Sequence, residues 1–404
     1  MFDLNPLSMS GKSIELTTLL RVLLPLGVIA VVAILFFSLC AKSKKGVFIT
    51  KICLASTLSA LYIFRFIFWI VRVVHISSNH TFTTNYLPRA LGLDVPSYLI
   101  LLSIASLFMS AFSKKQHKTL EFFEHTLLGV GLTYGLISIF RLDMIDVYDN
   151  LYHALNIQAI IFMIALIFVP LYLIKTNELK PKLSKFWYAI AGYTCIASLC
   201  MTVSLIMFNG NISEMTYSST LRKIGWTVSF PWHLLIVIPV FLIICFAVYW
   251  IVSIIYNKVS LDTETHEYHA RNEFFDLYSF ATKSICCLQG LLILIILATL
   301  IRKPLGTPLG LLCLLPFIMT VFCVYASFEM DKQSSLNDEH VFDKGNKNIR
   351  PLIAYTLIGN VIFGLVLVKQ IKNEREAIEY RKERIEKKRL KEQQKQEENK
   401  NGKI

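Results

Sequence analysis

Two arginines inside a long apolar stretch are the residues of this sequence best suited to chemistry. Arg65 stands in the run Phe64-Arg65-Phe66, and Arg72 follows seven residues later on nearly the same helical face. A charge inside the hydrocarbon layer is costly, so such a residue usually serves an ion, a ligand or another buried charge. Arg65 is 14 residues from Lys51, which places it about 21 Å from the lysine-rich end of the predicted helix.

The polar residues expected beside these arginines come from the fourth and fifth apolar stretches and from the link between them. They are Tyr134, then Asp143, Asp146 and Asp149 in the link, and His153, Asn156 and Gln158 where the fifth stretch begins. We interpret them as the lining of an outward-facing polar pocket in which Arg65 and Arg72 bind a ligand. The alternative is a hydrogen-bond network that clamps the helices together, since polar side chains often hold membrane helices in contact.

Other catalytic or metal-binding patterns are weak. His266 and His269 stand near Asp262, Glu264 and Glu267, a spacing that could bind a metal. Membrane di-iron enzymes need many more clustered histidines, and the nine histidines of this chain are scattered. We therefore predict a solvated connecting helix there and no metal site. No nucleophile elbow, P-loop or dinucleotide fingerprint occurs, so we predict neither an enzyme nor a bound cofactor.

The nine cysteines lie in or at the edges of apolar stretches rather than in exposed links. An extracellular disulfide framework would need cysteines in the outer links. We therefore interpret the cysteines as small apolar packing residues.

The composition shows what kind of elements must position these residues. Of the 404 residues, 54% are hydrophobic and only 17% are charged, which excludes a soluble globular enzyme and a disordered protein. There are 41 Lys+Arg against 28 Asp+Glu. The basic residues form short clusters beside apolar stretches, which indicates membrane orientation rather than a nucleic-acid partner. We predict an all-α, polytopic transmembrane helical bundle whose main partner is the lipid bilayer.

Ten apolar stretches are long enough to cross a bilayer. They are residues 22–41, 50–74, 96–113, 122–140, 154–174, 186–208, 231–256, 284–301, 309–328 and 351–368. The predicted organisation is an outer N-terminal segment (1–21), a seven-span receptor-like core (22–256), a connecting loop (257–283), three further apolar segments (284–368) and a charged cytosolic helical tail (369–404).

The lysine clusters orient the chain. They follow the first, third and fifth stretches, which places these three links in the cytosol and the N-terminus outside. The two glycosylation sequons, at Asn79 and Asn211, then fall in outer links, where a glycan can be attached. We predict an integral membrane protein of the plasma membrane or an endomembrane, glycosylated at these two asparagines.

The tail creates a conflict of parity. Residues 369–404 carry 13 Lys+Arg and 8 Glu, which is typical of a cytosolic segment. With the N-terminus outside, a cytosolic tail requires an odd number of crossings, and ten is even. The stretch 284–301 is short and is followed by Arg302, Lys303 and Pro304. We therefore predict that it enters and leaves on the cytosolic side as a re-entrant or interfacial segment. The chain would then cross the membrane nine times. Ten crossings would require either a cytosolic N-terminus or a tail outside the cytosol.

The sequence of the tail predicts a helix that could bind a partner. Ile371, Ile378 and Ile385 recur every seven residues, but the complementary heptad positions are polar, which favours a solvated single helix over a coiled coil. The basic cluster at 381–389 could bind an anionic leaflet or a cytosolic protein partner.

Residues 48–140 carry a succession of features that is known from a family. The features are Arg65 followed by aromatics as far as Trp69, Leu87-Pro88 in the next link, Leu93-Asp94-Val95-Pro96-Ser97 opening the third stretch, and Lys114, Lys115 and Lys118 behind it. The succession resembles the plant tobamovirus-multiplication type of seven-helix membrane proteins and their animal orphan-receptor-like relatives. The resemblance implies a receptor-like protein of internal membranes that acts with small GTPases or as a scaffold, without catalysis. This chain departs from the family in Phe112-Ser113-Lys114, where a tryptophan-containing segment is usual, and in its three additional apolar stretches.

The leading functional prediction is a receptor-like or scaffold membrane protein that binds a ligand at its outer or luminal side, or partners through its tail. A secondary transporter of an anion or small organic solute is the alternative, because intramembrane arginines and proline-kinked helices also suit a transport pathway. A structural subunit of a larger membrane complex is the third possibility.

Overall fold

The computed structural model describes seven longer ranges of the chain and a few short pieces between and beyond them. These are residues 43–76, 93–113, 118–140, 154–206, 225–259, 269–301 and 308–335, with 27, 215, 218, 221, 386–387, 390 and 393–394. Helices joined by short turns make up these ranges, and they contain no strand, which confirms the all-α prediction. The chain divides into two compact units, residues 1–267 with 287–321 and residues 268–286 with 322–404.

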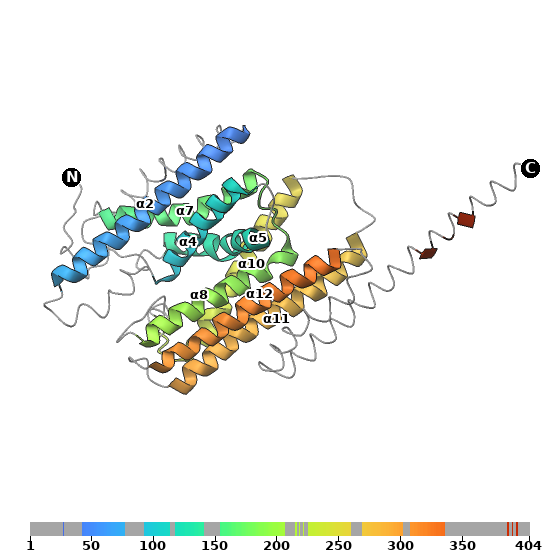
Figure 1. Cartoon of the computed structure of the whole chain (residues 1–404). Helices are drawn as coiled ribbons and strands as arrows, with labels where there is room; N and C mark the ends of the chain where they lie inside the picture. The colour runs from blue at the N-terminus through green and yellow to red at the C-terminus, as the bar shows by residue number, and fades with distance from the viewer. Residues whose placement is uncertain are drawn as a thin grey trace, which may run out of the picture. The chain divides into compact units, whose positions relative to one another are not determined.

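The described elements follow one another along the chain as Figure 1 shows. They are α2 (Lys44–Ile76), α4 (Val95–Phe112), α5 (Lys118–Thr126), η1 (Leu127–Gly131), α6 (Leu132–Phe140), α7 (Ala154–Lys175), η3 (Leu183–Lys185), α8 (Trp187–Ile206), α10 (Leu234–Val259), α11 (His269–Ile301), η5 (Pro308–Cys313) and α12 (Leu314–Ser335). The element η1 is a π-helical turn, and η3 and η5 are 3₁₀ turns.

Seven helices in the described ranges are long and apolar enough to cross a membrane, as in a multi-pass membrane protein. They are Lys44–Phe68, Val95–Phe112, Ile157–Lys175, Leu183–Ile206, Leu234–Tyr256, Lys283–Ile301 and Pro308–Tyr325. The predicted stretch 122–140 corresponds to α5, η1 and α6, which follow each other without a break. The predicted stretches 22–41 (apart from Gly27) and 351–368 lie outside the described residues, so the count of nine or ten crossings is not confirmed.

Helix α8 is the most enclosed helix of the first unit. Of the residues in the most apolar part of its candidate span, 78% are buried. The corresponding shares are 22% in α2 and 17% in α10. Close packing against α5 and η1 depends on two glycines. A Cβ at Gly192 would lie 2.2 Å from Cγ2 of Thr126, and one at Gly129 would lie 2.3 Å from Cβ of Ala189. Only glycine permits these approaches, which are typical of helix contacts in membranes.

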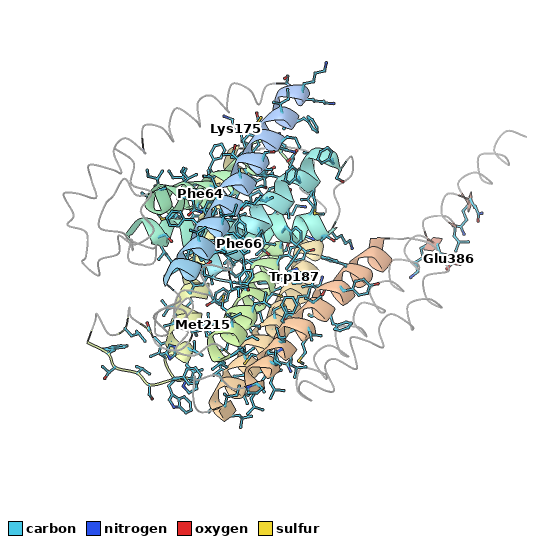
Figure 2. The ribbon with its side chains drawn as sticks, turned by 60° about the vertical axis from the view of Figure 1, so that its left-hand side comes forward. Phe64, Phe66, Lys175, Trp187, Met215 and Glu386 are labelled. Atoms are coloured by element: carbon cyan, nitrogen blue, oxygen red, sulfur yellow. The ribbon has the colours of Figure 1, made fainter. Side chains whose placement is uncertain are left out.

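The outer helices turn large apolar side chains away from the protein. Phe66, on α2 in Figure 2, is 37% exposed, and Ile243 on α10 is 67% exposed. Tyr325 on α12 is 62% exposed. Exposed apolar side chains along helices of spanning length are the surface that lipid tails contact.

Helices α2 and α4 lie antiparallel, and their contacts define the two ends of the first unit. Lys51 of α2 meets the last turn of α4 at Ser110, whereas Arg65 meets Asp94 at the beginning of α4. We call the end with Lys51 the lysine end and the end with Arg65 the arginine end. Helix α8 runs from the lysine end to the arginine end, because the Sγ of Cys200 lies 3.8 Å from the carbonyl oxygen of Leu93.

Helix α11 contains residues 284–301, which we predicted to form a re-entrant or interfacial segment. It is a single helix of 33 residues, not a segment that turns back. The hydroxyl of Thr194 on α8 donates to the carbonyl of Cys287 at 3.2 Å. Further on, a Cβ at Gly310 of η5 would lie 3.0 Å from Leu205 and Ile206 at the other end of α8. Within the first unit α11 therefore runs beside α8 from the lysine end to the arginine end. This course favours a crossing, and the side on which residues 284–301 enter and leave the membrane stays a prediction.

Helix α12 then runs back along α11. A Cβ at Gly290 of α11 would lie 2.9 Å from the hydroxyl oxygen of Thr320 on α12. In the second unit, the thiols of Cys286 and Cys323 are in hydrogen-bond contact. The eight described cysteines form no disulfide with one another.

Candidate functional site

The arginine end holds a nearly buried ion pair. Nη2 of Arg65 lies 3.0 Å from Oδ2 of Asp94, and the two side chains are 9% and 13% exposed. Asp94 is the N-cap of α4, and its Oδ1 accepts hydrogen bonds from the backbone N–H (3.3 Å) and from the hydroxyl of Ser97. The sequence Asp94-Val95-Pro96-Ser97 encodes this turn, since aspartate caps a helix and proline suits its first turn. One carboxylate thus binds the arginine and starts the helix.

Two tyrosines lie near the carboxylate of the pair. Tyr62, one turn before Arg65 on α2, and Tyr98 on α4 both lie near enough to interact electrostatically with Asp94. The contact between Cys200 and Leu93 attaches α8 to the residue before the cap. Three helices therefore meet at this end of the first unit.

The predicted outward-facing pocket stays a prediction, and the structure describes only some of its residues. Arg65 pairs with Asp94, which we did not include among its partners. Gln158 is 3% exposed in α7, and its Nε2 has no hydrogen bond with the described residues. Tyr134 lies half-buried in α6.

The structure does not describe the remaining predicted site residues well enough to test them. Arg72 and Asn156 belong to α2 and α7, but their side chains are outside the description. His153 and the sequon residues Asn79 and Asn211 lie outside the described residues altogether, as do the aspartates at 143, 146 and 149.

A sequence signal for Asp94 was present. An aspartate before Pro96 and Ser97 at the start of an apolar stretch is an N-cap pattern. Its position at the beginning of α4 places it opposite a residue late in α2, because consecutive membrane helices joined by a link are antiparallel. Asp94 entered the sequence analysis only through the family resemblance, and not as a partner of Arg65.

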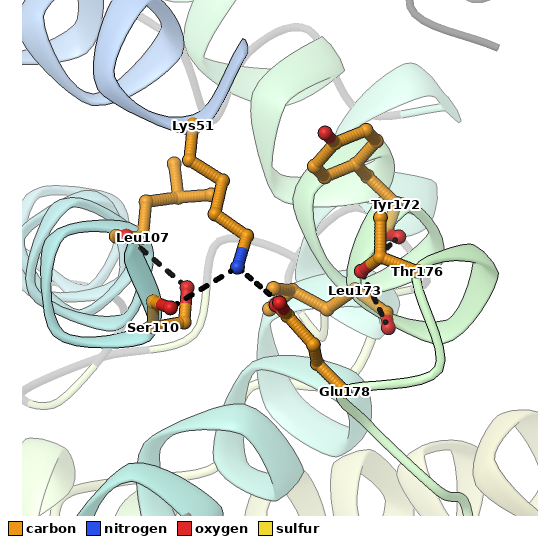
Figure 3. A network of polar contacts seen from close by, with 7 residues as sticks. All are labelled: Lys51, Leu107, Ser110, Tyr172, Leu173, Thr176 and Glu178. Atoms are coloured by element: carbon orange, nitrogen blue, oxygen red, sulfur yellow. Dashed lines mark hydrogen bonds and ion pairs between the residues drawn. The ribbon is translucent and has the colours of Figure 1, made fainter. Parts of the chain in front are cut away.

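The lysine end holds a second charged contact, drawn in Figure 3. The ammonium of Lys51 donates to the carbonyl of Ser110 at 3.2 Å and forms an ion pair with Glu178, which follows α7. The side chains are 3% and 29% exposed. Helix α7 ends in a turn in which Asn177 has a φ of 59°, a conformation that asparagine tolerates. This turn directs Glu178 back toward α2.

A third contact joins α5, α10 and the segment before η3. The hydroxyl of Tyr249 donates to the carbonyl of Lys182 at 2.9 Å and lies 2.7 Å from Nδ1 of His125. A hydroxyl has one proton, so with that proton on the Lys182 carbonyl, Nδ1 of His125 must be the donor to the Tyr249 oxygen. Nε2 then carries the lone pair and lies 3.9 Å from Oε1 of Glu121.

His125 is held in its neutral form. It lies in α5, outside the seven candidate spans, and is 2% exposed. Burial, followed by the positive charges of Lys185 and Lys182, lowers the pKa of His125 to about 3. Lys185 also lies 3.4 Å from Glu121, so the carboxylate near Nε2 is paired with a lysine.

The described ranges contain no group of three or more His, Cys, Asp or Glu side chains that could hold a metal ion. At both ends of the first unit the described charged side chains form ion pairs and hydrogen bonds.

No family model matches the chain, nor does any curated protein or solved structure. The resemblance to the tobamovirus-multiplication type of proteins thus stays a prediction.

Proposed function

We propose that the chain is a receptor-like multi-pass membrane protein in which an anionic ligand acts on the Arg65–Asp94 pair. The observation that supports this most directly is the pair itself: two charges 3.0 Å apart, nearly buried, between two helices of spanning length. A buried ion pair is weak evidence for stability, because apolar residues of similar size often serve as well. Such a pair is better suited to a functional role, in which a competing anion breaks it.

A carboxylate or phosphate is the chemical group that would compete for Arg65, since a guanidinium binds both in a two-pronged geometry. Its entry would displace Oδ2 of Asp94 and weaken the attachment of α2 to the beginning of α4. Helix α2 is one continuous helix of 33 residues that Lys51 holds at the lysine end. A change in the tilt of α2 at the arginine end would therefore also act on the Lys51–Glu178 contact.

The same observation argues against the transporter alternative. An anion pathway needs a positive charge that the moving anion can use and leave. The charge of Arg65 is compensated by Asp94 of the same chain. Such a pair suits a site that changes between a paired and an anion-bound state. It suits a transport route through the membrane less well.

A scaffold role of the tail is the second candidate, favoured by the few described tail residues. Glu386 and Lys387 are helical and exposed, and Leu390 is helical and 53% exposed. An exposed leucine on a charged helix can contact a partner protein or an anionic membrane surface.

The purified full chain, titrated with acetate, succinate, glutamate and inorganic phosphate while its thermal unfolding is followed, tests the receptor proposal. We expect at least one of these anions to stabilise the protein. Arg65→Gln should abolish the effect, whereas Asp94→Asn should tighten the apparent affinity several-fold because it removes the competing carboxylate. Equal loss of the effect in both variants, or no stabilisation by any anion, would contradict the proposal.

A further inference from the structure

We propose that residues 175–185, which join α7 to α8, form a preformed docking surface for the phosphate of an anionic lipid headgroup. We call this segment the lysine loop. Lys175, labelled in Figure 2, is exposed, as are Lys180 and Lys182. None of the three has an ion-pair partner among the described residues. Lys185 is 27% exposed and is paired with Glu121, so the three exposed lysines supply the charge of the surface.

Contacts with the protein interior fix the lysine loop at three points. Glu178 pairs with Lys51 of α2. The side chain of Leu179 is fully buried, and the backbone N–H groups of residues 178 and 179 both donate to the carbonyl of Leu173 at 3.1 Å. The carbonyl of Lys182 accepts the hydroxyl proton of Tyr249.

These three contacts use groups that point into the protein, which leaves the lysine side chains free to point out. The single acidic residue of the loop, Glu178, is occupied by Lys51 and does not compete for the exposed lysines. A surface whose backbone is already fixed loses less conformational freedom on binding than a mobile one. The loop therefore combines charge with preorganisation.

The position of the loop selects a lipid over a soluble ligand. It joins the candidate spans Ile157–Lys175 and Leu183–Ile206, so it lies where two spanning helices leave the hydrocarbon layer, at the level of the lipid phosphates. Each basic residue close to an anionic leaflet strengthens binding about fivefold, and three together strengthen it about a hundredfold.

A lysine-rich link could attract anionic lipid through its charge alone. The two explanations differ in their dependence on the contacts beneath the loop. Tyr249→Phe removes one contact and no charge. Glu178→Gln removes another and makes the loop more positive by one unit. Diffuse attraction predicts no change for the first variant and tighter binding for the second, whereas a preformed surface predicts weaker binding for both.

The experiment uses the full chain in detergent micelles, titrated with fluorescent phosphatidylinositol 4-phosphate and, as the neutral probe, phosphatidylcholine. We expect the anionic lipid to bind at least tenfold more tightly than the neutral one. The triple variant Lys175→Gln/Lys180→Gln/Lys182→Gln should lose about a hundredfold in affinity. Lys44→Gln/Lys45→Gln is the matched control, because these lysines are exposed at the lysine end of α2 but lie outside the loop.

The two contact variants complete the test. We expect Tyr249→Phe and Glu178→Gln each to weaken binding of the anionic lipid three- to tenfold while circular dichroism stays that of the parent chain. Tighter binding by Glu178→Gln, or equal losses in the triple variant and the Lys44/Lys45 control, would overturn the proposal in favour of diffuse charge. Equal affinity for both lipids would overturn it outright. If Tyr249→Phe does not fold, Glu178→Gln alone decides, since the two explanations predict opposite signs for it.

Discussion

Lys51 and Glu178 form an ion pair across 127 residues of sequence. Because the same ammonium also bonds to the carbonyl of Ser110, one lysine joins α2, α4 and the end of α7. Arg65 and Asp94 close the other end of the α2–α4 pair. The helix that carries both cations is thus held at two points about 21 Å apart along its axis.

The first prediction concerns the lysine end. Lys51→Met should lower the free energy of unfolding by about 1–3 kcal/mol, because it removes the cation that pairs with the partly buried carboxylate of Glu178. The double variant Lys51→Met/Glu178→Met should recover most of the loss, since two apolar side chains can replace a buried pair. Unfolding in mixed detergent micelles measures both. A double variant as unstable as the single one would show that Lys51 acts through packing or through Ser110 alone.

The second prediction concerns the packing of α8. Gly192→Ala should destabilise the protein by about 1–3 kcal/mol, because the added methyl group would lie 2.2 Å from Thr126 and force the helices apart. Gly131→Ala is the matched control, since its methyl group would approach no described atom closer than 3.4 Å. The control should cost much less, and alanine is also the better helix former. Thermal unfolding of the two variants side by side measures the difference; equal losses would argue against a tight α5–α8 contact.

The third prediction concerns pH. The pKa of His125 is lowered to about 3 in the folded chain, below the value of about 6.5 in an unfolded chain. The stability that depends on its neutral form is therefore complete above about pH 6.5 and is lost as the pH falls towards 3. We expect the parent chain to lose about 2 kcal/mol more than His125→Asn between pH 7 and pH 5. Parallel stability curves for the two proteins would show that His125 is not held neutral.

The fourth prediction concerns topology. Because α11 runs beside α8 to the arginine end, the link 302–307 should be accessible from the side opposite to the lysine loop. A membrane-impermeant maleimide on sealed vesicles can compare Leu305→Cys with Lys180→Cys. We expect the two cysteines to be labelled from opposite sides. Labelling from the same side would restore the sequence-based prediction that 284–301 enters and leaves on the cytosolic side.

Much of this fold follows from the sequence, because a long apolar stretch has few alternatives to a helix. The eight predicted stretches within the described ranges are all helical there. Arg65 stood out for the same reason, since a charge among aromatics is visible without a structure. The prediction for 284–301 relied on local charges such as Arg302, whereas the structure shows that these residues belong to one continuous helix.

The partners of the charged residues were harder to predict. Asp94 was recognised only as part of a family resemblance, and Glu178 lay unnoticed within a basic link. Both pairings are tertiary: 29 residues separate Arg65 from Asp94, and 127 separate Lys51 from Glu178. Periodicity within a helix shows which face a residue occupies but not which residue of another helix lies opposite.

The central claim is that the arginine end communicates with the lysine end through α2. Cys53, exposed on α2 two residues beyond Lys51, can carry an environment-sensitive fluorophore when Cys40 and Cys195 are replaced by serine. The decisive measurement is the emission of this label in Asp94→Asn. Ser59→Ala is the control, because the hydroxyl of Ser59 donates to the carbonyl of Ala55 in the same helix. The account predicts a shifted emission in Asp94→Asn and none in the control. An unchanged emission in Asp94→Asn would contradict it, because the two ends would then be independent.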